Sequence, residues 1–246
     1  MPRTAVVVPT PDGACPATLH TPAGDGPWPG VILYPDAAGV RETFAVLADR
    51  LAGPGYAVLL PDVYYRTPYT PFDPATVFAD PAERARLEAL VKSVGADLAD
   101  RDAGAFLDFL AAHPDVSGTG VGVTGYCMGG RLALRAAGRH PGRVAAAASF
   151  HGGNLAAEGD PDSPHLLAGR MRAAIHVAAA EADRSFPPDQ HERLRRALTE
   201  AGVRHTLETY PAAHGFAVPD VPTYDADADR RHREALAALW ATALHA

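Results

Sequence analysis

The chain has 246 residues and a formal net charge of −7, and hydrophobic residues make up 47% of it against 21% charged residues. This composition is that of a globular chain able to bury a large core, so we expect a single domain over residues 1–246. The excess of acidic residues argues against a nucleic acid or an anionic membrane as partner. No apolar run reaches the roughly 18 residues that crossing a bilayer requires.

The cysteines and glycines exclude several kinds of site. Cys15 and Cys127 are too few for a framework of disulfide bonds, and neither a C-x-x-C spacing nor a His/Asp cluster indicates a metal. Gly125 to Gly130 lack the Lys-Ser/Thr pair of a phosphate-binding loop, so we expect no nucleotide and no other cofactor. The first fifteen residues do not resemble a secretory signal. We expect a cytoplasmic protein, monomeric or homodimeric, that acts on a small molecule.

The predicted elements begin with an antiparallel hairpin, in which residues 4–9 and 14–20 flank the turn Thr10-Pro11-Asp12-Gly13. Runs of apolar residues then predict buried strands at 30–34, 56–60, 121–125, 144–150, 174–180 and 205–210. Between them, apolar residues at helical spacing predict helices around 44–51, 103–110, 128–139, 194–201 and 236–243. This alternation predicts an α/β protein with a mostly parallel central sheet flanked by helices.

Residues 64–81 do not fit this alternation, because they are too rich in proline for a regular element and too aromatic for a simple tether. Ligands of open α/β sheets bind beyond the carboxyl ends of the strands, and this segment follows such an end. It is either a loop that overhangs a pocket or a surface excursion pinned by its aromatic residues. Tyr64 and Tyr65 are candidates for contact with a substrate.

The sequence Gly125-Tyr126-Cys127-Met128-Gly129 has the form glycine-x-nucleophile-x-glycine and lies between a predicted strand and a predicted helix. A sharp turn there holds the nucleophile in strained backbone angles, and the two glycines leave room for the turn. The positive end of the helix dipole favours a thiolate at Cys127, and the N–H of Met128 is placed to stabilise an oxyanion. The alternative is that Cys127 is a small buried apolar residue.

A thiol nucleophile needs a base and a carboxylate that orients the base, and in this arrangement both follow the nucleophile along the chain. His214 lies just past the predicted strand 205–210, and Asp183 just past the strand 174–180. We therefore predict that both lie with Cys127 at the carboxyl edge of the sheet. Glu181 and Asp62 are rival carboxylates.

Two further residues are expected at the substrate pocket. His151 follows the strand 144–150 at the same edge, but it precedes Asp183 in the chain, so we interpret it as part of the pocket wall and not as the base. Phe216, two residues after His214, is the second expected substrate contact.

Gly-Tyr-Cys-Met-Gly-Gly, the Asp183 loop and His-Gly-Phe-Ala together resemble the dienelactone hydrolase family of α/β-hydrolases, from Val31 to the last helix. The resemblance implies the α/β-hydrolase fold and hydrolysis of a small ester or lactone through an acyl-enzyme. It assigns Cys127 as nucleophile, Asp183 as the residue that orients the base, and His214 as the base.

The stretch Tyr34-Pro35-Asp36-Ala37-Ala38-Gly39-Val40 is similar to the family's loop after its third strand. There the family has a glutamate that contacts the resting thiol, and Asp36 occupies that position. The resemblance also implies that the N–H groups of Ala37 and Met128 form the oxyanion hole.

Members that bind a substrate carboxylate do so with arginines, one of them just after His-x-Phe-Ala. Here that position is Val218, and Arg84 or Arg86 are candidates for the other. We therefore expect a more neutral ester or lactone as substrate.

Two other functions stay open. The same site would serve a pathway-specific cyclase, acyltransferase or thioesterase in which water is not the acceptor. Alternatively, the fold would serve as a non-catalytic binding protein.

Overall fold

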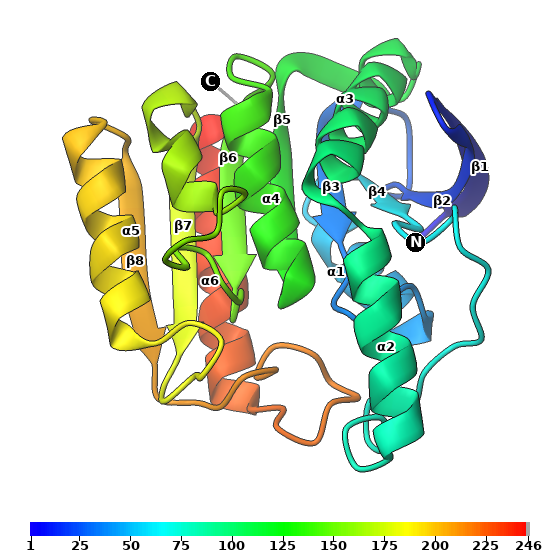
Figure 1. Ribbon diagram of the computed structural model, residues 1–246. Coiled ribbons are helices and arrows are strands. Elements are labelled where there is room, and N and C mark those ends of the chain that lie inside the picture. The colour runs from blue at the N-terminus through cyan, green and yellow to red at the C-terminus, as the bar shows by residue number, and fades with distance from the viewer. Residues whose placement is uncertain (245–246) are drawn as a thin grey trace.

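The computed structural model describes residues 1–244, in which eight strands form one sheet in the order β1-β2-β4-β3-β5-β6-β7-β8 (Figure 1). β1 pairs antiparallel with β2, and β2 with β4, whereas all pairs from β4 to β8 are parallel. The strands are β1 (Arg3–Thr10), β2 (Gly13–His20), β3 (Trp28–Tyr34), β4 (Ala57–Pro61), β5 (Val116–Tyr126), β6 (Val144–Phe150), β7 (Ala174–Ala180) and β8 (His205–Tyr210). The predicted hairpin and mostly parallel sheet are confirmed.

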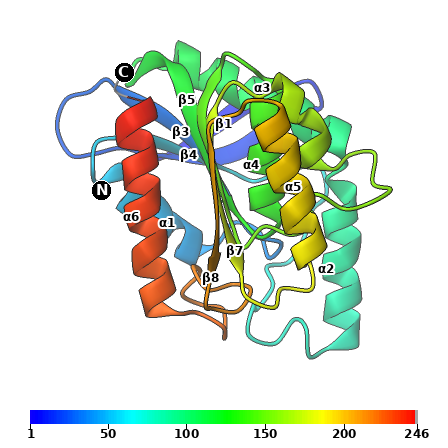
Figure 2. The same cartoon turned by 90° about the vertical axis from the view of Figure 1, so that its left-hand side faces the viewer.

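Helices cover both faces of this sheet. Figure 2, which views the sheet nearly edge-on, shows α1 and α6 on one face and α3, α4 and α5 on the other. Because both faces are covered, every residue of β4 and β7 is buried, which explains their continuous apolar sequences. The helices are α1 (Glu42–Ala52), α2 (Pro81–Ser93), α3 (Ala96–Ala112), α4 (Met128–Arg139), α5 (Pro188–Glu200) and α6 (Ala226–Ala243), with a short 3₁₀ helix at Pro164–Arg170.

Helix α2 is an element that the sequence patterns do not predict. Its buried residues are Leu87 and Leu90, too few to form the apolar stripe by which a helix is recognised. The start of α2 is nevertheless determined locally, because the side chain of Asp80 accepts hydrogen bonds from the N–H groups of Ala82 and Glu83. The helix therefore depends on its cap and on the segment it covers more than on a core face.

Strand β5 is longer than the predicted strand 121–125. Its first residues, Val116 and Ser117, pair with Trp28 and Pro29 of β3. This part of the strand contains glycine and polar residues and is only partly buried, so it lacks the apolar run on which the prediction rests.

The carboxyl ends of the parallel strands lie at the lower edge of the sheet in Figure 1. The loops that follow β7 and β8, yellow and orange in that view, lie at this edge, and the orange loop extends toward α2. The topology therefore brings together the segments that carry the predicted triad. None of the helices described in residues 1–244 has both the length and the apolar character that spanning a membrane demands.

A buried polar cluster ties the C-terminal helix to the end of β5. The hydroxyl of Tyr126 lies 2.8 Å from Nε2 of His232, whose Nδ1 lies 3.1 Å from Oδ1 of Asp229. Asp229 also accepts a hydrogen bond from the hydroxyl of Tyr224. Since Tyr126, His232 and Asp229 are all buried, each depends on the others for its hydrogen bonds.

We expect His232→Leu to lower the free energy of unfolding by about 2 kcal/mol, because it leaves the buried hydroxyl of Tyr126 without its acceptor and removes one hydrogen bond from the carboxylate of Asp229, which keeps Tyr224 and Arg233 as partners. Urea denaturation followed by circular dichroism measures this change. Arg230→Ala is the matched control, since it removes an exposed ion pair from the same helix and should leave the denaturation midpoint unchanged. Equal midpoints for the two variants would contradict a stabilising role for the cluster.

Candidate active site

Cys127 lies at a strained turn between β5 and α4. Its backbone angles are φ 54° and ψ −116°, a combination that costs free energy in any residue with a side chain. Hydrogen bonds on both sides hold the turn: the N–H of Cys127 donates to the carbonyl of Phe150, and its own carbonyl accepts from the N–H of Gly130. Cys127 is partly exposed, so the alternative of a fully buried apolar cysteine does not apply.

The two glycines of the motif are required by close backbone contacts. A Cβ atom at Gly125 would lie 2.1 Å from the carbonyl oxygen of Gly129, and one at Gly129 would lie 2.4 Å from the carbonyl oxygens of Tyr34 and Pro35. The turn therefore packs directly against the end of β3, which brings Cys127 close to the loop that follows β3.

Asp183 is the carboxylate that reaches His214, with 2.7 Å between its Oδ2 and Nδ1 of His214. Its other oxygen accepts hydrogen bonds from the N–H and the hydroxyl of Ser185. The other two carboxylates considered for this role are placed differently. Glu181 is exposed, and the Asp62 carboxylate accepts a hydrogen bond from the N–H of Tyr64. The structure thus brings Cys127, Asp183 and His214 together from the ends of β5, β7 and β8.

Charges and hydrogen bonds in this group favour a protonated His214. Burial alone would lower the pKa of His214, but its hydrogen bonds to Asp183 and Cys127 and their negative charges raise it to about 10. Burial raises the pKa of Asp183, but the hydrogen bonds from His214 and Ser185 outweigh this effect and lower it to about 2. The pair therefore stabilises the fold at neutral pH, and its contribution is lost as the pH rises through about 10 or falls toward 2.

The loop after β3 is held by a cluster of charges. Asp36 accepts a hydrogen bond from the N–H of Ala38 at 3.0 Å and two from the Arg41 guanidinium at 2.7 and 2.9 Å. Arg41 also donates to Asp220, which follows His214 in the chain. The resemblance implies a contact between Asp36 and the resting thiol. Among the described residues, the hydrogen-bond partners of the Asp36 carboxylate are instead Arg41 and Ala38. Arg41 instead links the β3 loop to the His214 loop.

The two predicted oxyanion donors come from different segments: Ala37 lies in the loop after β3, and Met128 lies at the start of α4. The carbonyl of Asp36 accepts a hydrogen bond from the N–H of Gly39, which orients the peptide group whose N–H belongs to Ala37. Met128 is the first residue of α4, where backbone N–H groups have no acceptor within the helix. Tyr64 contacts both residues, since its hydroxyl donates to the Ala37 carbonyl at 2.9 Å and lies 3.4 Å from Met128 Sδ.

A cavity of about 70 Å³ lies beside Cys127 and His214, with Asp36 and His151 in its polar part. The rest of its wall is apolar: Ala37, Ala38, Pro74, Val77, Phe78, Leu87, Gly215 and Val221. Because residues 74–78 and α2 contribute to this wall, segment 64–81 overhangs the pocket. These apolar wall residues resemble core residues in the sequence, so no pattern identifies them as pocket lining, and no pattern predicts α2.

Three predicted substrate contacts, Tyr64, Tyr65 and Phe216, lie outside this wall. Tyr64 is buried, and its hydroxyl bonds to the Ala37 carbonyl. The hydroxyl of Tyr65 donates to Asp102 and lies 2.6 Å from that of Thr10, which directs it toward the N-terminal hairpin. Phe216 is fully buried behind the pocket, with its ring centroid 4.9 Å from that of His151. Of these residues, Phe216 has a ring contact with a residue of the cavity wall, His151.

The candidate residues for binding a substrate carboxylate also lie away from the cavity. Val218 is fully buried. Arg84 pairs with Glu88, and Arg86 pairs with Glu83, each on α2. The pocket wall therefore contains no arginine among the residues that the structure describes.

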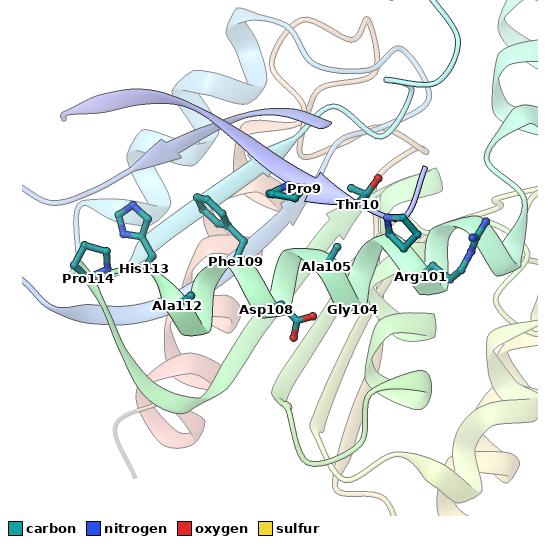
Figure 3. A pocket seen from close by; sticks show the side chains of 11 residues that line it. Pro9, Thr10, Arg101, Gly104, Ala105, Asp108, Phe109, Ala112, His113 and Pro114 are labelled. Atoms are coloured by element: carbon teal, nitrogen blue, oxygen red, sulfur yellow. The ribbon is translucent and has the colours of Figure 1, made fainter. Parts of the chain in front are cut away.

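A larger hollow, about 710 Å³, lies between β1 and α3, where Pro9 and Thr10 face Phe109 and His113 (Figure 3). It contains no residue of the predicted triad. Over residues 1–244, no three His, Cys, Asp or Glu side chains gather as they would around a metal ion. The chemistry-bearing side chains gather at the smaller cavity.

We expect Asp183→Asn to lower the pKa of His214 from about 10, because burial of the imidazole remains while the carboxylate that favours its charged form is lost and only the contribution of Cys127 is left. A titration of the imidazole resonances by NMR measures this pKa. Glu181→Gln, which removes a nearby exposed carboxylate, serves as the control and should leave the titration unchanged. A His214 that titrates alike in both variants would rule out the coupling.

Comparisons with known proteins identify the family of this chain. A model of the dienelactone hydrolase family matches residues 15–244. A candidate carboxymethylenebutenolidase of Escherichia coli (strain K12) is 30% identical over 209 residues, which cover 82% of this chain and 72% of that protein. The carboxymethylenebutenolidase of Pseudomonas sp. (strain P51) is 27% identical over 215 residues, covering 87% of this chain and 84% of that protein.

Among solved structures, the crystal structure of a candidate dienelactone hydrolase from Klebsiella pneumoniae subsp. pneumoniae MGH 78578 superposes with a TM-score of 0.85 at 25% identity, covering 98% of both chains. The predicted α/β-hydrolase fold is confirmed. With the family match spanning nearly all of the described residues, this chain is a hydrolase that belongs to the dienelactone hydrolase family.

Proposed function

We propose that this protein hydrolyses a small neutral ester or lactone through a Cys127–His214–Asp183 triad and an acyl-enzyme. One observation carries the proposal: a partly exposed cysteine at a strained turn lines the same cavity as a histidine that a buried aspartate holds at 2.7 Å. This is the arrangement of an activated nucleophile, its base and the group that orients the base.

In the first half-reaction, the sulfur of Cys127 attacks the carbonyl carbon and forms a tetrahedral intermediate. The negative charge on the carbonyl oxygen is stabilised by the N–H groups of Ala37 and Met128, a contribution that typically amounts to about 3 kcal/mol for each donor. The intermediate collapses as the carbon–oxygen bond to the leaving group breaks. His214 gives its proton to the departing oxygen, and a thioester on Cys127 remains.

In the second half-reaction, neutral His214 takes a proton from a water molecule, whose oxygen attacks the thioester carbon. The carbon–sulfur bond breaks, the carboxylic acid leaves, and Cys127 and His214 return to their starting states. Asp183 keeps the imidazole in the required orientation and favours its charged form in both steps. The expected cytoplasmic location and monomeric or homodimeric state remain predictions.

The pocket favours an uncharged substrate. Arg41, the arginine that binds Asp36 at the pocket, already pairs its single positive charge with two carboxylates, those of Asp36 and Asp220, and the remaining wall is largely apolar. A substrate carboxylate placed there would lose its hydration without gaining an unpaired cation, since the charged His214 is already paired with Asp183, and this loss is costly. The free volume of about 70 Å³ also favours small substituents.

We expect Cys127→Ala to abolish hydrolysis of p-nitrophenyl acetate, because the thioester cannot form. Absorbance of the released nitrophenolate measures turnover, and intact-protein mass spectrometry after rapid quenching detects the acetylated parent enzyme. Cys15→Ala is the matched control, since Cys15 is a buried residue of the hairpin strand β2, and it should retain parental turnover. Parental turnover by Cys127→Ala would refute the triad.

Addition of an alcohol or a thiol to the same assay shows whether the acyl group goes to water or to another acceptor.

We expect kcat/KM for p-nitrophenyl pentanoate to exceed that for mono-p-nitrophenyl succinate by at least about 10-fold, since the latter places a carboxylate against apolar residues. The two acyl chains are similar in length, so their comparison isolates the charge. Steady-state kinetics at pH 7.5 and at several salt concentrations measure the ratio. Preference for the succinate would contradict the assignment of a neutral substrate.

A further inference from the structure

His151 is buried at the active-site cavity without hydrogen bonds to its ring. It follows β6 directly, is 1% exposed, and lines the cavity together with Cys127 and His214. Neither of its ring nitrogens has a hydrogen-bond partner among the residues that the structure describes. Buried polar atoms almost always have partners, so a side chain with two orphaned nitrogens at a cavity requires an explanation.

The surroundings of His151 hold its ring in place without satisfying it. Its ring packs edge-on against His214 and Phe216, with centroid distances of 5.1 and 4.9 Å. The backbone N–H of His151 donates to the carbonyl of Ala178. The φ of His151 is 39°, in the left-handed region that residues with a side chain rarely adopt. The fold therefore holds this ring at the cavity at a cost in free energy. The cost comes from the strained backbone and from ring nitrogens that have no partner among the described residues.

The charge state of His151 defines what it can bind. Burial and the neighbouring charge of His214 keep the pKa of His151 well below its ordinary value, so the ring is neutral at pH 7. A neutral imidazole offers one N–H donor and one acceptor nitrogen. A hydroxyl group can bind at either nitrogen, since its oxygen accepts from the N–H and its hydrogen donates to the other nitrogen.

Building on the proposed esterase function, we propose that His151 is a specificity residue that recognises a hydroxyl group on the substrate, near the scissile ester. The preferred substrates are then neutral hydroxylated esters or hydroxylated lactones. The rest of the substrate then contacts the apolar wall formed by Val77, Phe78 and Val221. The imidazole of His151, which lines the same cavity, supplies the polar contact.

Two pairs of esters with closely matched shapes test this assignment. Ethyl 2-hydroxypropanoate and ethyl 2-methylpropanoate differ by a hydroxyl on the acyl side, and 2-hydroxyethyl butanoate and propyl butanoate differ on the alcohol side. In the parent enzyme we expect kcat/KM to favour the hydroxylated member of one pair, and His151→Phe should reduce that preference by about 10-fold or more. The rate for the matching apolar ester should change by much less, and the pair affected identifies the side of the ester that carries the hydroxyl.

His176→Phe is the matched control. His176 is also buried with an unpartnered Nε2, but it lies on β7 outside the cavity wall, so its substitution should leave both ratios unchanged. If His151→Phe does not fold, His151→Asn provides the second test, because asparagine tolerates a left-handed backbone and alters the polar contact.

The result that overturns the proposal is an equal preference in the parent and the His151 variants, which would mean that the ring serves an ordered water only. That outcome differs from failure of the proposed function, in which the parent enzyme cleaves none of the four esters or Cys127→Ala cleaves them as well. Loss of cleavage of all four esters in a folded His151→Phe protein also counts against a specificity role.

Discussion

The strained backbone at Cys127 is the constraint on which the rest of the structure depends. A residue with φ 54° and ψ −116° persists only where its surroundings leave it no alternative. Here the backbone of Gly129 packs against the end of β3, and the turn is hydrogen-bonded to the end of β6. On the opposite side, buried Tyr126 is tied to α6 through His232. The core thus holds the thiol at the carboxyl edge of the sheet.

The same turn determines the polarity of the site. It places the start of α4 and the sulfur beside a loop whose arginine is already occupied, because Arg41 binds both Asp36 and Asp220. The remaining charged pair at the cavity is His214 with Asp183. A site of this kind has little cationic character to offer a substrate, and its walls from segment 64–81 and α2 add apolar surface. Charge selectivity and nucleophile activation therefore follow from one arrangement of loops.

The two histidines at the cavity illustrate how environment separates the roles of identical side chains. His214 has a carboxylate and a thiol as partners, and these raise its pKa, whereas His151 has aromatic rings and no partner for its nitrogens in the described chain, and burial lowers its pKa. One imidazole is therefore suited to proton transfer and the other to neutral hydrogen bonding. Their rings lie 5.1 Å apart, so the charge on His214 itself helps to keep His151 neutral.

The alternation of strands and helices, the hairpin, the turn at Cys127 and the positions of Asp183 and His214 at strand ends can all be predicted from the sequence. These features are local, because apolar periodicity and glycine spacing depend on residues near each other in the chain. Other features become visible only in the folded chain: Arg41 binds Asp36, Tyr65 turns toward the hairpin, and residues 74–78 and α2 form part of the pocket wall. Such contacts join segments distant in sequence, and an apolar or charged residue carries no sign of the partner that the fold will bring to it.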